Sequence, residues 1–387
     1  MNTSQLLDTF HDLYGTSDRT ESVFFSPGRV NLIGEHTDYN GGYVFPCALS
    51  FGTYLVARGN GSGILRFATT NFDHRGEVNL NEPFTKSGKD WINYPLGVLN
   101  EFRKIAREVE GLDLLYSGDI PNGAGLSSSA SIEMVTAFAM DRLFGFGMER
   151  MDLARLSQRA ENQFVGVNCG IMDQFASGMG ARDHALFLNC DTLEYERVPL
   201  KLEGMKIVIS NTNKRRGLAD SKYNERRAQC EAAVEAIGSE KNIRHLSDLT
   251  LEEYRQHSHL ITDPEVQKRA RHVITENHRT LSAIDALNRG DIEAFGQLMN
   301  QSHDSLRDDY EVTGNELDTL VEEARGIDGT LGSRMTGAGF GGCTVSIVRE
   351  EAVETFIREV GRGYKERTGL VADFYVAEAG DGSKQLQ

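Results

Sequence analysis

The chain has 387 residues, of which 39% are hydrophobic and 25% are charged, a composition typical of an ordinary globular protein long enough for two domains. Its formal net charge is −16. Because so acidic a chain repels the phosphates of nucleic acids and of anionic membranes, neither is an expected partner.

The first residues predict a short amphipathic helix over 4–14, without the basic and apolar regions of a signal peptide. No apolar run approaches the length of a membrane span. The five cysteines form no C-x-x-C pair, which favours free thiols in a reducing compartment over disulfides or structural zinc. We therefore expect a cytoplasmic protein.

A dense polar run follows the strand predicted at 23–25. Between the glycines at 34 and 41 it carries four polar side chains close together: Glu35, His36, Asp38 and Asn40. A surface turn or a metal site would also accommodate such residues. The density favours a binding site for a ligand with several hydroxyl groups, such as a sugar, because each hydroxyl needs its own fixed donor or acceptor.

The next segments alternate as strands do, over 51–58, 63–69 and 75–80. The glycine-rich residues 59–63 predict a hairpin-like turn between the first two. A helix is expected from Trp91 to about Glu108, and a strand over 112–117.

The residues from Pro121 to Ser131 lie where that strand gives way to a predicted buried helix at 132–140. Unpaired backbone N–H groups and the helix dipole favour an anion at such a junction. Gly123 and Gly125 would let the backbone approach a ligand closely, and the serines add hydroxyl groups. A plain glycine loop with a serine N-cap is the alternative.

Two familiar nucleotide motifs do not fit this chain. The loop at 121–131 contains no lysine and is therefore not a Walker A motif. Residues 337–342 match G-x-G-x-x-G formally, but 343–348 reads as a strand, whereas a dinucleotide fold needs a helix there.

Two carboxylates in the middle of the chain are candidates for function. Glu161 lies near the C-terminal end of a helix predicted over 150–165, where a negative charge is unfavourable unless a cation such as Mg²⁺ or a salt bridge compensates it. Asp173 stands among small and apolar residues, so it is either paired, functional or a first-turn helix residue.

The rest of the chain predicts strands, then helices, then a β–α–β unit. Strands are expected at 184–190, 193–198 and 205–210, helices at 215–237, 264–288, 291–308 and 315–326, and the final unit at 343–348, 351–366 and 371–377. The segment 239–265 gives mixed signals. We place a domain boundary near residue 205.

Three separated stretches, at 27–42, 121–130 and 336–342, together resemble the signatures of the GHMP kinases, and the first resembles the galactokinase branch of that superfamily. The resemblance extends over essentially the whole chain. It implies an α+β fold with two domains: 1–204, similar to ribosomal protein S5 domain 2, and 205–387, ferredoxin-like. The active site would lie in the cleft between them.

The resemblance also implies an activity, the transfer of the γ-phosphoryl group of ATP to the anomeric hydroxyl of α-D-galactose, with Mg²⁺ as cofactor. Asp173 matches the catalytic base and Arg29 its partner. The sugar-binding positions match Glu35, His36, Thr37, Asp38, Gly170 and Tyr223. The ATP-binding positions match Thr69, Gly123, Ala124, Gly125, Leu126, Ser127, Ser128 and Ser129. Ser129 and Glu161 match the metal ligands, and the loop at 337–342 would close on the phosphate side.

Three alternatives remain open at this stage. A galactose- and ATP-binding sensor without catalysis would keep the same motifs, although the phosphate loop, Arg29 and Asp173 are all present. A kinase for N-acetylgalactosamine would need room for a 2-acetamido group. A non-catalytic structural protein would require all three motifs to be coincidental. Galactose and ATP are the expected partners, and no obligate protein partner is expected.

Overall fold

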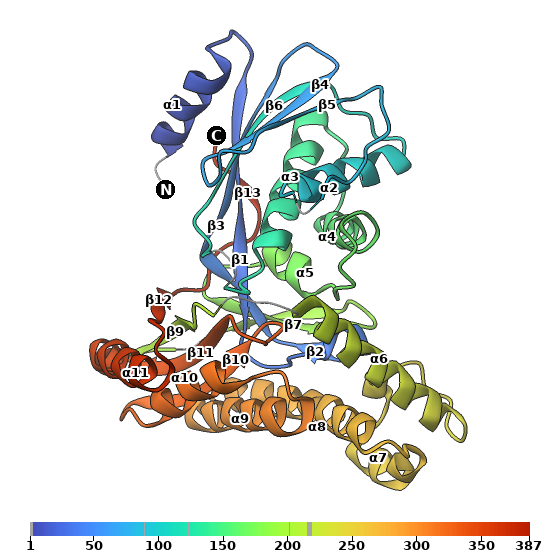
Figure 1. The fold of residues 1–387 in the computed structure, drawn as a ribbon, viewed down its shortest axis with the longest axis vertical. Coiled ribbons are helices and arrows are strands. Elements are labelled where there is room, and N and C mark those ends of the chain that lie inside the picture. The colour runs from blue at the N-terminus through green and yellow to red at the C-terminus, as the bar shows by residue number, and fades with distance from the viewer. Residues whose placement is uncertain (1–2, 89, 122–123, 201, 215–218) are drawn as a thin grey trace.

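The structure is a computed structural model, and it describes residues 3–88, 90–121, 124–200, 202–214 and 219–387. Two groups of elements follow one another along the long axis of the molecule (Figure 1). The upper group contains most of the chain before residue 180, and the lower group most of the chain after 204.

A six-stranded sheet organises the upper group. Its strand order is β13-β1-β3-β6-β4-β5. The strands are β1 (Glu21–Asn31), β3 (Pro46–Gly59), β4 (Ile64–Thr69), β5 (Gly76–Asn79), β6 (Leu112–Gly118) and β13 (Lys384–Gln385). The long antiparallel pair of β1 and β3 shifts register between Pro27 and Arg29, which marks a bulge in β1.

Helices cover both faces of this sheet. One face packs against α2 (Asn93–Lys104), α3 (Ser128–Phe144), α4 (Arg150–Arg159) and α5 (Met172–Met179) to form a large apolar core. On the other face, α1 (Thr3–Tyr14) packs Leu6 and Phe10 against Val23 and Val56. The sheet is therefore buried on both sides where these helices lie, as the near-continuous apolar character of β6 requires.

A second, antiparallel sheet organises the lower group, in the order β10-β11-β9-β12. Its strands are β9 (Met205–Asn211), β10 (Thr330–Thr336), β11 (Cys343–Arg349) and β12 (Asp373–Ala377). One face packs against α10 (Asn315–Arg325) and α11 (Val353–Thr368), and the other against α8 (Pro264–Asn288) and α9 (Ile292–Ser305). This gives three layers.

Three short strands and two helices complete the fold. The strands β2 (Tyr43–Val44), β7 (His184–Asn189) and β8 (Tyr195–Pro199) form a separate sheet. The helices α6 (Ala219–Gly238) and α7 (Leu251–His257) pack with the first part of α8 around a core that includes Cys230, Ile237 and Val273. The segment with mixed sequence signals thus contains a helix at α7.

The two groups share one apolar core. Val30 at the end of β1, with Leu32 and Phe45 from the connection to β3, packs with Ile209 and Val345 of the second sheet and with residues of α8 and α9. The chain also returns to its start, because β13 pairs with β1 at Phe24 and Phe25. The second sheet begins at Met205, but the last strand belongs to the first sheet. The division into 1–204 and 205–387 stays a prediction.

Most predicted elements are confirmed, and the mixed α and β content agrees with the predicted class. The predicted hairpin at 59–63 is wrong: β6 inserts between β3 and β4, pairing with one antiparallel and with the other in parallel. Residues 59–63 do connect β3 to β4. Their local sequence does not reveal that a strand from elsewhere in the chain lies between these two strands in the sheet. Strands β10 and β13 were not predicted.

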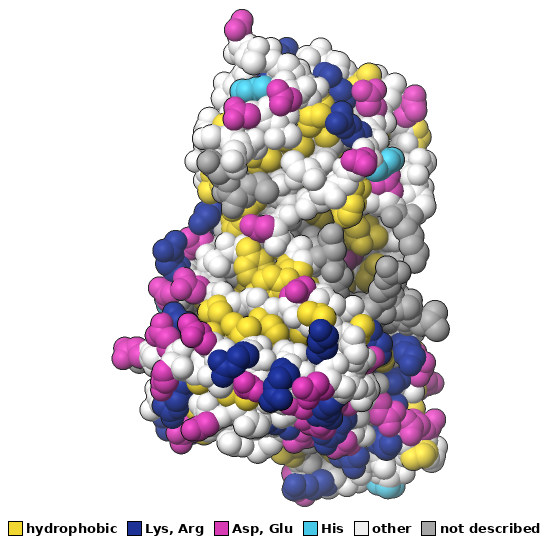
Figure 2. All heavy atoms as spheres, turned by 60° about the vertical axis from the view of Figure 1, so that its left-hand side comes forward, with side chains coloured by type: hydrophobic (Ala, Val, Ile, Leu, Met, Phe, Trp, Pro, Cys, Tyr) yellow, Lys and Arg dark blue, Asp and Glu magenta, His cyan; other side chains and the backbone are white. Residues whose placement is uncertain are grey.

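The face at the left of Figure 1 carries charged side chains of both signs, mixed over its lower half, with hydrophobic side chains gathered near its middle (Figure 2). Val371, just before β12, is 59% exposed, and Val376, on β12, is 47% exposed. Within the described parts of the chain, no helix is long and apolar enough to cross a bilayer.

Candidate active site

A pocket of about 510 Å³ opens between the two groups of elements, a size suited to small-molecule ligands. Its lining comes from six segments far apart in the sequence: residues 29–38, the residues just before and at the start of α2 (Lys86 to Tyr94), the start of α3, residues 161–173, Tyr223 and Asn224 of α6, and the loop at 337–338. Predicted site residues in the lining are Arg29, Glu35, His36, Asp38, Gly125, Ser127, Ser128, Ser129, Glu161, Gly170, Asp173 and Tyr223.

The polar run at 34–40 forms a tight loop at the closed end of the pocket. Gly34 has φ of 88°, and a Cβ there would lie 2.5 Å from the carbonyl oxygen of Tyr43, so only glycine fits. The Thr37 hydroxyl donates to the carbonyl oxygens of Gly34 (3.0 Å) and Tyr43 (2.7 Å). Thr37 is buried and does not line the pocket, so its contacts shape the loop.

His36 faces the pocket as a neutral ring. Its Nδ1 lies 2.9 Å from the Tyr39 hydroxyl, which lies 2.8 Å from the Tyr310 hydroxyl. Burial lowers the pKa of His36 to about 3, with the His272 ring as the next cause. Its buried Nε2 has no hydrogen-bond partner among the described residues. A buried nitrogen on a pocket wall without a partner is suited to a ligand hydroxyl.

Asp38 depends on a glycine that is distant in sequence. A Cβ on Gly170 would lie 1.9 Å from Oδ2 of Asp38, so the carboxylate occupies the space that a side chain would fill. Burial, followed by the negative charge of Asp173, raises the pKa of Asp38 to about 7. Tyr223 of α6 closes this side, with its ring 5.7 Å from that of His36.

A paired arginine and aspartate lie in the middle of the pocket. Nε of Arg29 donates to Oδ1 of Asp173 (2.8 Å) and Nη2 donates to Oδ2 (3.0 Å). The remaining Nη1 donates to the carbonyl oxygen of Gly125 (2.8 Å). Asp173 stands in the first turn of α5, as the sequence suggested. Arg29 is buried, whereas the Asp173 side chain is 26% exposed, which leaves the carboxylate accessible to a ligand.

The serine-rich loop approaches this pair at the start of α3. The N-cap Ser127 has φ of 60° and makes no side-chain cap bond. Its hydroxyl instead donates to Oδ2 of Asp173 (2.6 Å), so the simple N-cap interpretation is wrong. Ala124 and Leu126 are buried in the shared core, which anchors the loop. Gly123 lies outside the described residues.

Glu161 is a buried carboxylate with no ion pair to a described residue. The predicted helix continues past α4 as a π-helix (Ala160–Val165), and this irregularity places Glu161 beside α5. Gln174 Nε2 donates to Oε2 of Glu161 (2.6 Å) and to Oε2 of Glu133 (3.0 Å). Burial raises the pKa of Glu161, and a hydrogen bond from Ser129 opposes the rise.

Ser129 and Glu161 fit a hard divalent cation. A hydroxyl and a carboxylate lie together at the pocket wall, and the buried negative charge lacks a described cationic partner. No group of three or more His, Cys, Asp or Glu side chains among the described residues could hold a metal. Mg²⁺ commonly takes one or two protein ligands and completes its shell with phosphate and water oxygens.

Three family profiles match the chain in order: a galactokinase galactose-binding signature at residues 8–59, a GHMP kinase N-terminal domain at 93–181 and a GHMP kinase C-terminal domain at 283–366. Galactokinase of Fusobacterium nucleatum is 54% identical over 386 residues, or 99% of each chain. Galactokinase of Bacillus subtilis is 48% identical, again over 99% of each.

The chain belongs to the galactokinase family. The crystal structure of Lactococcus lactis galactokinase complexed with galactose superimposes with a TM-score of 0.97 at 45% identity, covering 99% of this chain and 100% of that one. A crystal structure of mevalonate kinase, 18% identical with a TM-score of 0.63 over 92% of this chain and 98% of that one, shares the fold. The predicted GHMP kinase fold is confirmed.

The glycine-rich loop at 337–342 lies between the two ends of the galactokinase-family site. Gly337 and Ala338 line the pocket. A Cβ on Gly337 would lie 2.9 Å from the carbonyl oxygen of Gly125, and Gly337 has φ of 87°. Its N–H lowers the pKa of the Glu35 carboxyl. Gly337 therefore lies beside both the polar loop and the serine-rich loop, and the closing of this loop on the phosphate side stays a prediction.

Sequence reasoning missed several lining residues, and four of the described residues it assigned to the site do not line the pocket: Thr37, Thr69, Ala124 and Leu126. The missed residues are Lys86, Gly88, Asp90, Asn93, Tyr94, Val165, Gly166, Val167, Cys169, Met172 and Asn224. Most of them come from connections without periodicity, so the sequence offered no signal. Thr69 ends β4 with its hydroxyl near Asn71 (3.3 Å) and is absent from the lining.

Proposed function

We propose that this protein phosphorylates α-D-galactose at its anomeric hydroxyl with ATP, giving galactose 1-phosphate and ADP. The observation that carries the proposal is the Arg29–Asp173 pair, which stands between the polar loop at 34–40 and the serine-rich loop at 124–129 in one pocket. Family membership and the galactose complex of the L. lactis relative support the choice of sugar.

In this proposal the closed end of the pocket binds the sugar. The carboxylates of Glu35 and Asp38 accept hydrogen bonds from hydroxyl groups, and the free Nε2 of His36 adds a further contact. Tyr223 and the backbone at Gly170 complete the wall. Several fixed partners in one small volume suit the several hydroxyls of a hexose.

The serine-rich loop would hold the phosphates. Ser128 and Ser129, in the first turn of α3, line the pocket, and the unpaired N–H groups of a helix N-terminus favour anions. Ser129 and Glu161 would hold Mg²⁺, which supplies positive charge against the phosphates when bound. Thr37 and Thr69 do not line the pocket. Thr37 would therefore act by shaping its loop, and Thr69 would contact a nucleotide only if the nucleotide extended beyond the pocket.

Asp173 would accept the proton of the anomeric hydroxyl, and Arg29 would stabilise the charge of the transferring phosphoryl group. The Ser127 hydroxyl and the Arg29 fork fix both oxygens of Asp173 in place. Phosphoryl transfer has a loose transition state, so positioning and charge stabilisation supply most of the rate enhancement.

The direct test is ADP release with Mg·ATP across galactose, glucose, 2-deoxygalactose, N-acetylgalactosamine, mevalonate and homoserine. Turnover of galactose and 2-deoxygalactose, with little of the others, is the expected result. Galactose binding in calorimetry without any turnover would indicate a sensor. Turnover of N-acetylgalactosamine alone would indicate the right family and a different pocket.

The metal ligands have their own test. Ser129→Ala and Glu161→Ala should each raise the Mg²⁺ concentration needed for half-maximal rate, and should weaken Mg²⁺ binding to the ADP complex in calorimetry. Unchanged titrations in both experiments would exclude these two residues as ligands. The cytoplasm is the proposed compartment, supported by five cysteines without a C-x-x-C pair.

A further inference from the structure

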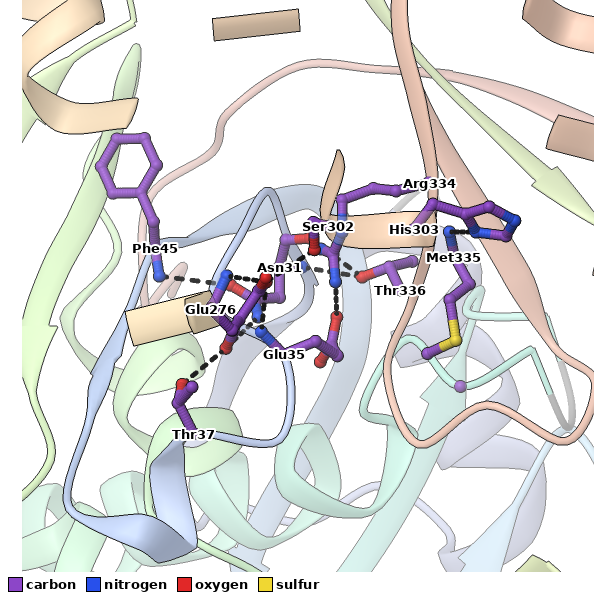
Figure 3. A network of polar contacts seen from close by, with 12 residues as sticks. Asn31, Glu35, Thr37, Phe45, Glu276, Ser302, His303, Arg334, Met335 and Thr336 are labelled. Atoms are coloured by element: carbon purple, nitrogen blue, oxygen red, sulfur yellow. Dashed lines mark hydrogen bonds and ion pairs between the residues drawn. The ribbon is translucent and has the colours of Figure 1, made fainter. Parts of the chain in front are cut away.

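A fully buried arginine reaches the sugar loop from the second sheet. Arg334 lies on β10, and its side chain has no exposed area. Nη2 donates to Oε2 of Glu35 (2.9 Å), and Nη1 donates to the carbonyl oxygen of Asn31 (2.8 Å) (Figure 3). The bond to Glu35 joins residues 299 positions apart. The carboxylate therefore depends on an element that the local sequence does not contain.

The backbone of Glu35 is also held from the second half of the chain. Oε1 of Glu276, on α8, accepts the N–H groups of Gly34 (3.0 Å) and Glu35 (3.2 Å). The Ser302 hydroxyl donates to the same oxygen at 2.6 Å (Figure 3). On the other side, Nε2 of His272 lies 3.1 Å from the carbonyl oxygen of Glu35. The backbone is thus fixed by α8, while the carboxylate is fixed by β10.

The charge of Arg334 opposes the electrostatic cost of burying Glu35. Glu35 is 2% exposed, and this burial raises its pKa. The nearby charge of Arg334 is the largest opposing cause, followed by the charge of Arg29 and the N–H of Gly337. An ionised carboxylate accepts hydrogen bonds only, whereas a protonated one would present a donor to the ligand. Without Arg334, both the direction of the side chain and its hydrogen-bonding character would change.

Arg334 can influence a ligand only through residues that line the pocket, and Glu35 is the lining residue to which its guanidinium bonds. Glu35 lines the pocket, but Arg334 does not. A simple contribution to folding stability is a weak explanation, because the desolvation of a buried ion pair often cancels its attraction. An apolar residue could fill the same space on β10 without holding Glu35 in a fixed direction.

We propose that Arg334 is a positioning residue for galactose, which holds the Glu35 carboxylate as a fixed acceptor for one sugar hydroxyl. The second half of the chain thereby contributes to sugar recognition without touching the sugar. This inference rests on the proposed function, and it adds a residue that acts on the KM for galactose and leaves the nucleotide side unchanged.

The test compares Arg334→Met and Arg334→Lys with a matched control, Arg269→Met. Arg269 is equally buried, at 2% exposure, and pairs with Glu265 (2.7 Å) and Glu311 (2.8 Å), neither of which lines the pocket. We expect Arg334→Met to raise the KM for galactose by about 30- to 100-fold, which matches the loss of a charged hydrogen bond. The KM for ATP should change by less than about threefold. Arg334→Lys should give an intermediate value, and Arg269→Met should leave both KM values unchanged.

A double-mutant cycle separates positioning from general damage. In the Glu35→Gln background, Arg334→Met should raise the KM for galactose by no more than about threefold, because the two residues act as a unit. Monodeoxygalactoses identify the hydroxyl concerned. One of them, which lacks the hydroxyl that Glu35 accepts from, should bind Glu35→Gln and the wild type equally well. The same deoxy sugar should also bind Arg334→Met and the wild type equally well. Equal losses for every deoxy sugar, or losses that add fully in the cycle, would overturn the proposal.

The remaining outcomes also decide the question. An unchanged KM for galactose in Arg334→Met, or equal increases for galactose and ATP, would exclude a positioning role. If Arg334→Met fails to fold, the same cycle with Arg334→Lys decides. If the wild type does not phosphorylate galactose, the proposed function fails, while galactose binding measured by calorimetry on the same variants still tests the link between Arg334 and Glu35.

Discussion

The two ends of the pocket are built in different ways. At the sugar end, Glu35 and His36 are almost fully buried, and partners from α8 and β10 hold their loop. At the phosphate end, Ser128 is exposed, and the loop is held by the neighbouring strand β1 and by Asp173. The closed end is suited to fixed recognition of a small ligand. The open end is suited to a nucleotide that must enter and leave.

The largest effect is expected from a substitution at the centre of the pocket, where its two ends meet. In Asp173→Asn, kcat should fall by about 10²- to 10⁴-fold because the proton acceptor is lost. Galactose affinity in calorimetry should change by less than about threefold, since the sugar contacts at Glu35 and His36 remain. Asp152→Asn, on the exposed surface of α4, is the control. Substantial turnover in Asp173→Asn would remove Asp173 from the role of base.

A methyl group added at the sugar end should impair the binding of galactose and leave the binding of ATP unchanged. Gly170→Ala places a Cβ 1.9 Å from Oδ2 of Asp38, so the carboxylate or the backbone must move. We expect the KM for galactose to rise by about 10- to 100-fold, while the KM for ATP stays within about threefold. Gly238→Ala, with no atom within 4 Å of the added Cβ, should leave both constants unchanged. Equal increases for both substrates would contradict a division between the two ends.

The pH dependence of the sugar end should sharpen the comparison. In the proposed function, galactose binds to Asp38 as an ionised acceptor. Burial, followed by the charge of Asp173, raises the pKa of this carboxyl to about 7. kcat/KM for galactose should therefore fall by about tenfold per pH unit below pH 7. A profile that stays flat from pH 8 to pH 5 would exclude Asp38 as the titrating group.

The same shift predicts a change in stability. The pKa of Asp38 rises from 3.8 in the unfolded chain to about 7 in the folded protein. The folded state therefore keeps a proton that the unfolded state releases, and this contribution to stability is lost as pH rises through 7. Asp38→Asn should melt at a higher temperature than the wild type at pH 8, and the difference should disappear near pH 4. A lower melting temperature at pH 8 would contradict this prediction.

The smallest expected effect concerns the phosphate end. Ser127→Ala removes one hydrogen bond to Asp173 but leaves both bonds from Arg29. A single hydrogen bond of about 1 kcal/mol corresponds to a roughly five- to tenfold fall in kcat. The KM for galactose should not change. A loss as large as that of Asp173→Asn would show that Ser127 takes a direct part in the reaction.

Much of the site was predictable because its residues stand in short, dense motifs. The polar run at 34–40 and the serine-rich loop at 121–131 each concentrate several functional groups between glycines, and a strand-to-helix junction carries a physical signal for anions. Asp173 stood out as a carboxylate among apolar neighbours, and it lies in the first turn of α5. Lys86, Asn93 and Tyr94 gave no such signal, although they line the same pocket.

The sequence by itself determined the class of fold, most helices and strands, and part of the pocket lining, because periodicity, turn residues and motif spacing are local properties. Tertiary structure alone decided the insertion of β6 between β3 and β4, the return of β13 to β1, and the contacts of Arg334 and Glu276 with the Glu35 loop. Each of these joins segments distant in the chain. Their pairing follows from the packing of a shared core, which no local pattern of residues encodes.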